Sequence, residues 1–166
     1  MATDLKSQPY AVPWPPLIVA AALVVAFLGE WAFPVGLHLG AFGRWLGWAL
    51  IAAGIGVNVW GVATMRRAGV NLAPHRSATG LVTSGAFAIT RNPIYLGTTV
   101  AFVGLGAAAN SLWFAVAALF AAKLIEIVAI RREEAHLDLL FGSQWVDYAA
   151  RVPRWLGPSH RREGGA

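Results

Sequence analysis

The sequence predicts an all-α integral membrane protein, a helical bundle of about four transmembrane helices followed by a cytoplasmic C-terminal helical tail. Of its 166 residues, 57% are hydrophobic and only 13% are charged. An ordinary soluble domain carries about 25% charged residues. Long apolar runs recur along the chain, and Lys and Arg gather at the ends of these runs. These observations favour a single membrane domain.

Four apolar runs are long enough to cross, or nearly cross, a hydrocarbon core of about 30 Å as helices. They cover residues 17–33, 45–65, 93–109 and 112–130. The first run carries Glu30 near its end, and Trp14 and Trp31 are its expected interface anchors. Only Asn110 and Ser111 separate the last two runs, which predicts a tight helical hairpin.

The positions of the basic residues predict the topology. Arg66 and Arg67 follow the second run, and Arg131 and Arg132 follow the fourth. Because short basic loops stay on the cytoplasmic side, we expect an inner membrane protein of bacterial type with both termini inside. The expected parts are an N-terminal segment (1–16), a transmembrane bundle (17–130) with a cytoplasmic loop (66–92), a helical tail (131–156) and a mobile tip (157–166).

Composition also excludes several classes of function. The chain has no cysteine, which excludes disulfides, thiolate zinc sites and cysteine nucleophiles, and we predict no metal site. The net charge of +5 does not indicate nucleic-acid binding. The cations lie at the ends of apolar runs rather than on a soluble module that could present them to DNA. A membrane scaffold without catalytic activity stays open as an alternative.

The tripeptide Arg91-Asn92-Pro93 predicts the start of a helix. The residue before a proline is pushed toward extended geometry, and proline suits the first helical position. Asn92 is therefore the expected N-cap. The free amide donors of a helix start and the charge of Arg91 can together hold a carboxylate or a phosphate. The alternative is that Arg91 reaches lipid headgroups and Asn92 only starts the helix.

Small residues form one face of the third run. Gly97, Ala101, Gly104 and Ala108 share this face, which predicts a groove against another helix. Gly104 and Gly106 offer a second interpretation, in which a ligand approaches the backbone closely. On an unbroken helix, however, these two glycines lie about 200° apart and cannot both face one ligand.

Charged residues continue from the fourth run into the tail. Lys123 and Glu126 lie inside the apolar run, where an ionisable group is costly and a functional or paired role is the default interpretation. On a straight helix, Glu126 aligns with Glu133 and Lys123 with Glu134, which predicts one polar stripe that ends beside Arg91. The alternative is an isolated pair between Lys123 and Glu126, with the later glutamates in solvent.

Two blocks of the sequence carry a resemblance to a known family. The first block is Gly80-Leu81-Val82-Thr83-Ser84-Gly85-Ala86-Phe87, leading into Arg91-Asn92-Pro93-Ile94-Tyr95-Leu96-Gly97. The second comprises Glu133, Glu134, Leu137, Phe141, Gly142, Trp145, Tyr148, Val152, Pro153 and Arg154. In order, spacing and membrane context, residues 80–156 resemble the small membrane methyltransferases related to isoprenylcysteine carboxyl methyltransferase and the phospholipid N-methyltransferases. Asn92 and Trp145 stand where the carboxyl methyltransferases have histidine and tyrosine, which leaves the acceptor open.

The resemblance implies a bundle that binds S-adenosylmethionine at its cytoplasmic end, beneath the tail, and reaches an amphiphilic acceptor from the bilayer. The residues expected to bind the cofactor are His75, Arg91, Asn92, Tyr95, Gly104, Gly106, Glu133 and Glu134. Those expected to act in catalysis are Arg91, Glu134 and Arg154. Arg91 suits the cofactor carboxylate, a glutamate suits its ammonium or ribose, and Tyr95 suits its adenine or sulfonium.

The expected reaction is direct in-line attack of an acceptor nucleophile on the cofactor methyl group, while the protein aligns the reactants and excludes water. The acceptor is an isoprenylcysteine-type carboxylate, a phospholipid amine or a small thiol. An amine must first lose a proton, to a base such as His75 or a glutamate. The same superfamily contains NADPH-dependent membrane reductases, which are a further alternative.

Overall fold

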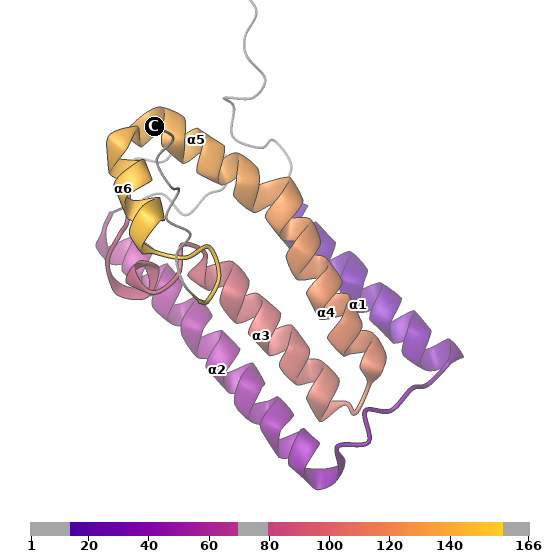
Figure 1. The fold of residues 1–166 in the computed structure, drawn as a ribbon. Helices are drawn as coiled ribbons and strands as arrows, with labels where there is room; N and C mark the ends of the chain where they lie inside the picture. Colours follow the sequence, from indigo (N-terminus) through magenta and orange to yellow (C-terminus); the bar gives the residue numbers. More distant parts are fainter. Residues whose placement is uncertain (1–13, 70–79, 158–166) are drawn as a thin grey trace, which may run out of the picture.

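The computed structural model describes residues 14–69 and 80–157, and these residues form helices joined by short connections (Figure 1). The elements are α1 (Trp14–Ala32), α2 (Gly40–Arg67), the 3-10 turn η1 (Gly85–Ala88), α3 (Pro93–Ala108), α4 (Leu112–Ile125), the π-helical segment η2 (Glu126–Ile130), α5 (Arg131–Phe141) and α6 (Ser143–Arg151). The all-helical prediction is confirmed for this part of the chain.

Three of the helices are long and apolar enough to cross a membrane, and α3 is a shorter apolar helix. The candidate spans are Trp14–Ala32, Gly40–Arg67 and Leu112–Phe141. The last of these corrects the predicted end of the fourth run, because the helix does not stop at residue 130 but continues through η2 into α5. The Arg and Glu residues after Ile130 end the apolar stretch, yet they are good helix formers and so extend the helix.

The helices α2, α3, α4 and α1 lie in one row, in that order (Figure 1). Contacts join α2 to α3, α3 to α4, and α4 to α1. The buried apolar core follows the centre of this row, where Phe102 of α3 meets Ile125 and the η2 residue Ile130. The α3 helix therefore has a neighbour on either side and carries its first residues to the end of the bundle where α5 and α6 lie.

Glycines set the close approach of α2 and α3. Gly47 and Gly54 of α2 are buried, and a side chain at either position would collide with the α3 backbone. Gly97 and Gly104 of α3 meet the backbone of α2 in return. The predicted groove of small residues is thereby confirmed, and its partner is α2. Such close packing gains dispersion contacts that lipid tails do not supply.

The end of the bundle away from α5 is closed by hydrogen bonds between two connections. The Leu112 N–H donates to the Val35 carbonyl at 2.9 Å, and the Trp113 indole N–H donates to the Phe33 carbonyl at 2.7 Å. Asn110 adopts a positive φ of 53° between α3 and α4, which permits the reversal there. The tight hairpin predicted from the sequence is confirmed. The expected anchor Trp31 is 79% exposed at this end.

The tail folds back over the opposite end of the bundle, where α3 begins (Figure 1). Gly142, at a φ of 50°, makes the turn between α5 and α6. Trp145, Tyr148 and Val152 are buried in a second apolar cluster, against which Leu81 packs. This cluster holds the tail close to the segment that leads into α3.

Candidate cofactor site

The chain after α6 is hydrogen-bonded to the residues that start α3. The Arg91 N–H donates to the Pro153 carbonyl at 2.9 Å. The Arg154 carbonyl accepts from the Thr90 hydroxyl and from Asn92 Nδ2, both at 3.0 Å. These bonds bring two segments that are about 60 residues apart in the sequence side by side.

The predicted start of α3 is confirmed, with Asn92 at the N-cap and Pro93 in the first turn. The Asn92 side chain does not cap the helix. It is buried, and its amide donates to the tail instead, while its own N–H donates to the Thr90 hydroxyl at 3.2 Å. The helix start is thus held by tertiary contacts rather than by a local cap.

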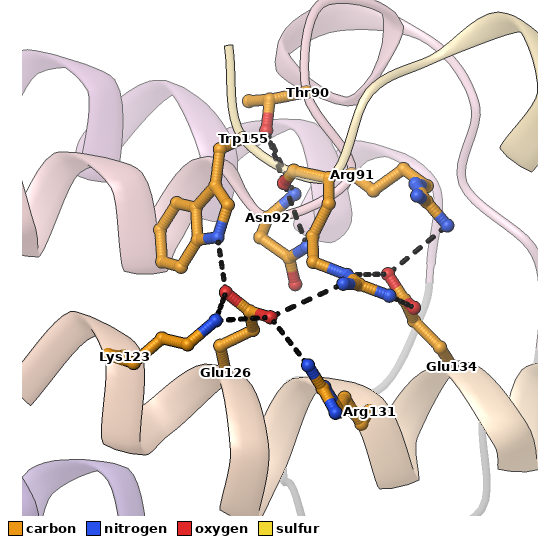
Figure 2. Close-up of polar contacts among 9 residues, drawn as sticks. Thr90, Arg91, Asn92, Lys123, Glu126, Arg131, Glu134 and Trp155 are labelled. Atoms are coloured by element: carbon orange, nitrogen blue, oxygen red, sulfur yellow. Dashed lines mark hydrogen bonds and ion pairs between the residues drawn. The ribbon is translucent and has the colours of Figure 1, made fainter. Parts of the chain in front are cut away.

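Glu134 is ion-paired with two arginines, Arg91 and Arg154, and its pairing is drawn in Figure 2. Arg91 Nη1 lies 3.1 Å from Glu134 Oε1. Arg154 donates from Nε to Oε1 at 3.0 Å and from Nη2 to Oε2 at 2.6 Å, which is the bidentate geometry of strong arginine–carboxylate pairs. The structure therefore brings together Arg91, Glu134 and Arg154, the three residues expected to act in catalysis.

A second carboxylate, Glu126, joins the same network (Figure 2). It accepts from Lys123 at 3.2 Å, from Arg131 at 3.2 Å and from Arg154 Nη1 at 3.4 Å. The Trp155 indole N–H donates to its other oxygen at 3.4 Å. Among these ion-paired residues, four cations surround two carboxylates. The surplus of positive charge suits an anionic group of a ligand.

Arg91 is the cation best placed to meet such a group. Its side chain is only 15% exposed, and its guanidinium carbon lies 5.6 Å from the centre of the Trp145 ring. Its Nε is buried and has no hydrogen-bond partner among the residues that the structure describes. A buried donor without a partner is costly, so this nitrogen is available to a ligand acceptor.

The surroundings shift the pKa values of both arginines. Burial lowers the pKa of Arg91, and the Glu134 carboxylate opposes this effect. For Arg154, the hydrogen bonds to Glu134 raise the pKa, and burial opposes them. An arginine keeps its charge at neutral pH in proteins, so both guanidinium groups hold a full positive charge in the site.

Several of the predicted cofactor-binding residues lie outside the network of Arg91, Glu134 and Arg154. Gly104 packs against α2 and Gly106 against α4, and both lie about 18 Å or more along α3 from Asn92 at about 1.5 Å per residue. Tyr95 is partly buried and packs against the apolar core of the bundle. Glu133 is exposed, one position before Glu134. The expected pocket residue His75 lies outside the described residues.

The expected alignment of Glu126 with Glu133 is wrong. The segment Glu126–Ile130 is π-helical, and a π-turn takes up one residue more than an α-helical turn. Glu126 and Glu134 consequently reach the same guanidinium, that of Arg154. The predicted pair between Lys123 and Glu126 is present, but it belongs to this larger network and is not isolated.

Glu126 and Trp155 were not among the expected site residues, although Glu126 belongs to the polar stripe predicted to end beside Arg91. The signal for Glu126 was its charge within an apolar run, although nothing local indicated its partner in the tail. Within the described ranges, no three His, Asp or Glu side chains are grouped so that they could hold a metal ion.

Comparison with known proteins identifies the family of the chain. The family model described as phospholipid methyltransferase matches residues 42–144. The nickel-cobalt-cadmium resistance protein NccN of Alcaligenes xylosoxydans xylosoxydans is 36% identical over 81 residues, which are 49% of this chain and 38% of that relative. The chain therefore spans well under half of that relative's length. The family match covers most of the bundle and half of the tail, and the chain belongs to the phospholipid methyltransferase family.

Proposed function

We propose that this member of the phospholipid methyltransferase family binds S-adenosylmethionine beside Arg91, Glu134 and Arg154, and transfers its methyl group to a membrane-associated acceptor. Family membership indicates a membrane methyltransferase. The observation that carries the choice of site is the buried Arg91 guanidinium at the start of α3, whose Nε has no partner within residues 14–69 and 80–157. This donor and the nearby helix start match a carboxylate such as that of the cofactor's methionine part.

From the charges around the site, we propose different roles for the two glutamates. Both oxygens of Glu134 already accept from arginines, so its role is to orient Arg91 and Arg154. Glu133 is exposed on the same helix, and its carboxylate suits the cofactor ammonium or ribose hydroxyls. Tyr95 and His75 are candidates to contact the adenosyl group. We assign Gly104 and Gly106 to helix packing.

The sulfonium of S-adenosylmethionine supplies an activated methyl group, so an acceptor lone pair forms the new bond while the carbon–sulfur bond breaks and leaves a neutral thioether. The protein holds the reactants in line and excludes water. The tail supports both tasks, because it is bonded to the start of α3 through the Arg154 carbonyl. Arg154 and Arg91 also offer positive charge to an anionic acceptor.

The acceptor is proposed to be amphiphilic and to approach from the bilayer. Leu124 and Ile127 are about half exposed on the helix that carries Glu126, and in a bilayer such apolar side chains face lipid. Lys123 is 60% exposed next to them. An isoprenylcysteine-type carboxylate, a phospholipid amine and a small thiol are the acceptor classes to be compared. An amine acceptor requires a base, for which His75 or Glu133 is the candidate.

The proposed orientation places the site on the cytoplasmic side of an inner membrane. Arg66 and Arg67 end α2 at the end of the bundle where α3 starts, and Arg131 begins α5 there. Basic residues of this kind favour the cytoplasmic face. Both the N-terminal end of α1 and the tail lie at this end of the row (Figure 1).

Calorimetric titration of the detergent-purified protein with S-adenosylmethionine, S-adenosylhomocysteine and NADPH tests the proposal. We expect saturable binding of the two adenosyl ligands, weakened by Arg91→Ala and by Glu134→Gln. If the folded wild type binds only NADPH, the reductase alternative replaces methyl transfer. If it binds none of the three ligands, a membrane scaffold becomes the better account.

A further inference from the structure

We propose that Glu126 is a positioning residue for the cofactor site, acting through Arg154. The inference rests on the S-adenosylmethionine site proposed above. Glu126 begins the π-helical segment Glu126–Ile130 within an otherwise α-helical stretch. The Arg131 N–H donates to the Glu126 carbonyl, five residues back, as a π-turn requires.

The π-turn changes which glutamate of the pair faces the site. In an unbroken α-helix, the residue seven positions after Glu126 is on nearly the same side, and that residue is Glu133. With one extra residue in the turn, Glu134 takes this side instead. The contacts agree, because Glu134 reaches Arg91 and Arg154, whereas Glu133 is exposed. Local π-turns of this kind are frequently found at functional sites.

Glu126 and Glu134 hold one guanidinium together. Glu134 accepts hydrogen bonds from Nε and Nη2 of Arg154, and Glu126 accepts one from Nη1 at 3.4 Å. The Trp155 indole N–H donates to the other Glu126 oxygen at 3.4 Å. The Glu126 side chain therefore fixes two consecutive residues of the tail, although its own helix is separated from them by about 30 residues of chain.

Because the Glu126 side chain is largely buried, the loss of these contacts would be costly. The Glu126 side chain is only 12% exposed, in a helix that is apolar enough to cross a membrane. A carboxylate at such a place is costly unless it is paired. Its partners Lys123 and Arg131 are more than half exposed, whereas Arg154 is the partner that connects Glu126 to the site.

The contact between Glu126 and Arg154 also influences the position of Arg91, through hydrogen bonds of the tail backbone. The Arg154 carbonyl accepts from Thr90 and Asn92, on either side of Arg91, and the preceding Pro153 carbonyl accepts from the Arg91 N–H. Whatever holds Arg154 in place also holds the start of α3. Removal of the Glu126 charge should therefore make the position of Arg91 less well defined, although Glu126 itself does not contact the cofactor in this proposal.

The test compares Glu126→Gln with Lys123→Gln, a matched control that also removes one charge from the Lys123–Glu126 ion pair but leaves Arg154 with both carboxylates. S-adenosylmethionine affinity is measured by calorimetry on protein whose thermal unfolding shows it to be folded. We expect Glu126→Gln to weaken binding roughly tenfold, the size of one charge-assisted hydrogen bond, and Lys123→Gln to change it less than about twofold. In an Arg154→Lys background, Glu126→Gln should add little.

Amide hydrogen exchange of residues 152–156 without ligand gives a second readout. Faster exchange in Glu126→Gln than in Lys123→Gln is expected if Glu126 holds the tail. Equal affinity and equal exchange in the two variants would overturn the role of Glu126 and leave the cofactor site standing. Failure of the folded wild type to bind S-adenosylmethionine would instead overturn the cofactor site, and the positioning role with it.

Discussion

Arg154 clamps Glu134 with two hydrogen bonds, from Nε to Oε1 at 3.0 Å and from Nη2 to Oε2 at 2.6 Å. The same residue offers its carbonyl to Asn92 at the start of α3. A single tail residue thus joins α5 to α3, and it does so beside Arg91. The tail is consequently part of the proposed cofactor site and not an appendage to the membrane bundle.

Replacement of Arg154 by lysine should weaken S-adenosylmethionine binding by about tenfold to a hundredfold. Lysine keeps the charge but cannot make the bidentate pair with Glu134, and hydrogen bonds to charged groups contribute about 1.5–3 kcal/mol. Calorimetric titration measures the change. Arg151→Lys is the control, because in the described part of the chain the Arg151 guanidinium bonds within its own helix, to the Asp147 carbonyl. Equal losses in the two variants would contradict the special role of Arg154.

The Trp145 ring should contribute to S-adenosylmethionine affinity through its contact with the Arg91 guanidinium. It is buried and lies under the Arg91 guanidinium at 5.6 Å, in a geometry worth about 1–2 kcal/mol when desolvated. We expect Trp145→Ala to weaken S-adenosylmethionine binding about tenfold and Trp145→Phe to weaken it less. Trp48→Ala, on the exposed side of α2, serves as the control. Fluorescence-monitored unfolding shows whether each variant is still stably folded, so that a loss of affinity can be told apart from a loss of stability.

Tyr148 should stabilise the tail in a pH-dependent way. Its hydroxyl donates to the Phe87 carbonyl at 2.8 Å, and Tyr148→Phe should cost about 1 kcal/mol of unfolding free energy near neutral pH. Burial raises the pKa of Tyr148 above its ordinary value, whereas the unfolded residue titrates near pH 10. The folded protein therefore retains a proton that the unfolded chain loses above about pH 10, and this contribution to stability falls as the pH rises.

Unfolding of the wild type and of Tyr148→Phe at several pH values measures this effect. The stability difference between the two proteins should be constant below about pH 9 and shrink above about pH 10. Taking the difference between the two unfolding free energies cancels the contributions of titrating residues that both proteins share. A difference that stays constant through pH 11 would show that Tyr148 is not held in its neutral form by the fold.

Packing of α2 on α3 should tolerate no side chain at Gly54. A Cβ there would collide with the backbone of Gly97 and Ala101, and overpacking of this kind costs about 1–3 kcal/mol. Gly56→Ala is a matched control two positions away, where nothing lies within 4 Å. We expect Gly54→Ala to lower the thermal stability in detergent and Gly56→Ala to leave it unchanged or slightly higher. Similar behaviour of both variants would contradict the α2–α3 contact.

The sequence predicted the elements that depend on neighbouring residues. Apolar runs between charged ends indicated the membrane helices, Asn92-Pro93 indicated the start of α3, and the small residues from Gly97 to Ala108 indicated a packed face. Each of these signals acts within a few turns of helix, where side-chain hydrophobicity, backbone sterics and side-chain volume decide the outcome. The grouping of Arg91, Glu134 and Arg154 came from the family resemblance.

Only the tertiary structure decided the register of the site. A straight helix through residue 126 aligns Glu126 with Glu133, whereas the π-turn aligns it with Glu134. The tail residues Arg154 and Trp155 engage Glu126 only because α5 and α6 fold back over the bundle. Such contacts arise between segments that are distant along the chain. Their geometry follows from how the helices pack, and it cannot be derived from the local preferences of the residues that make them.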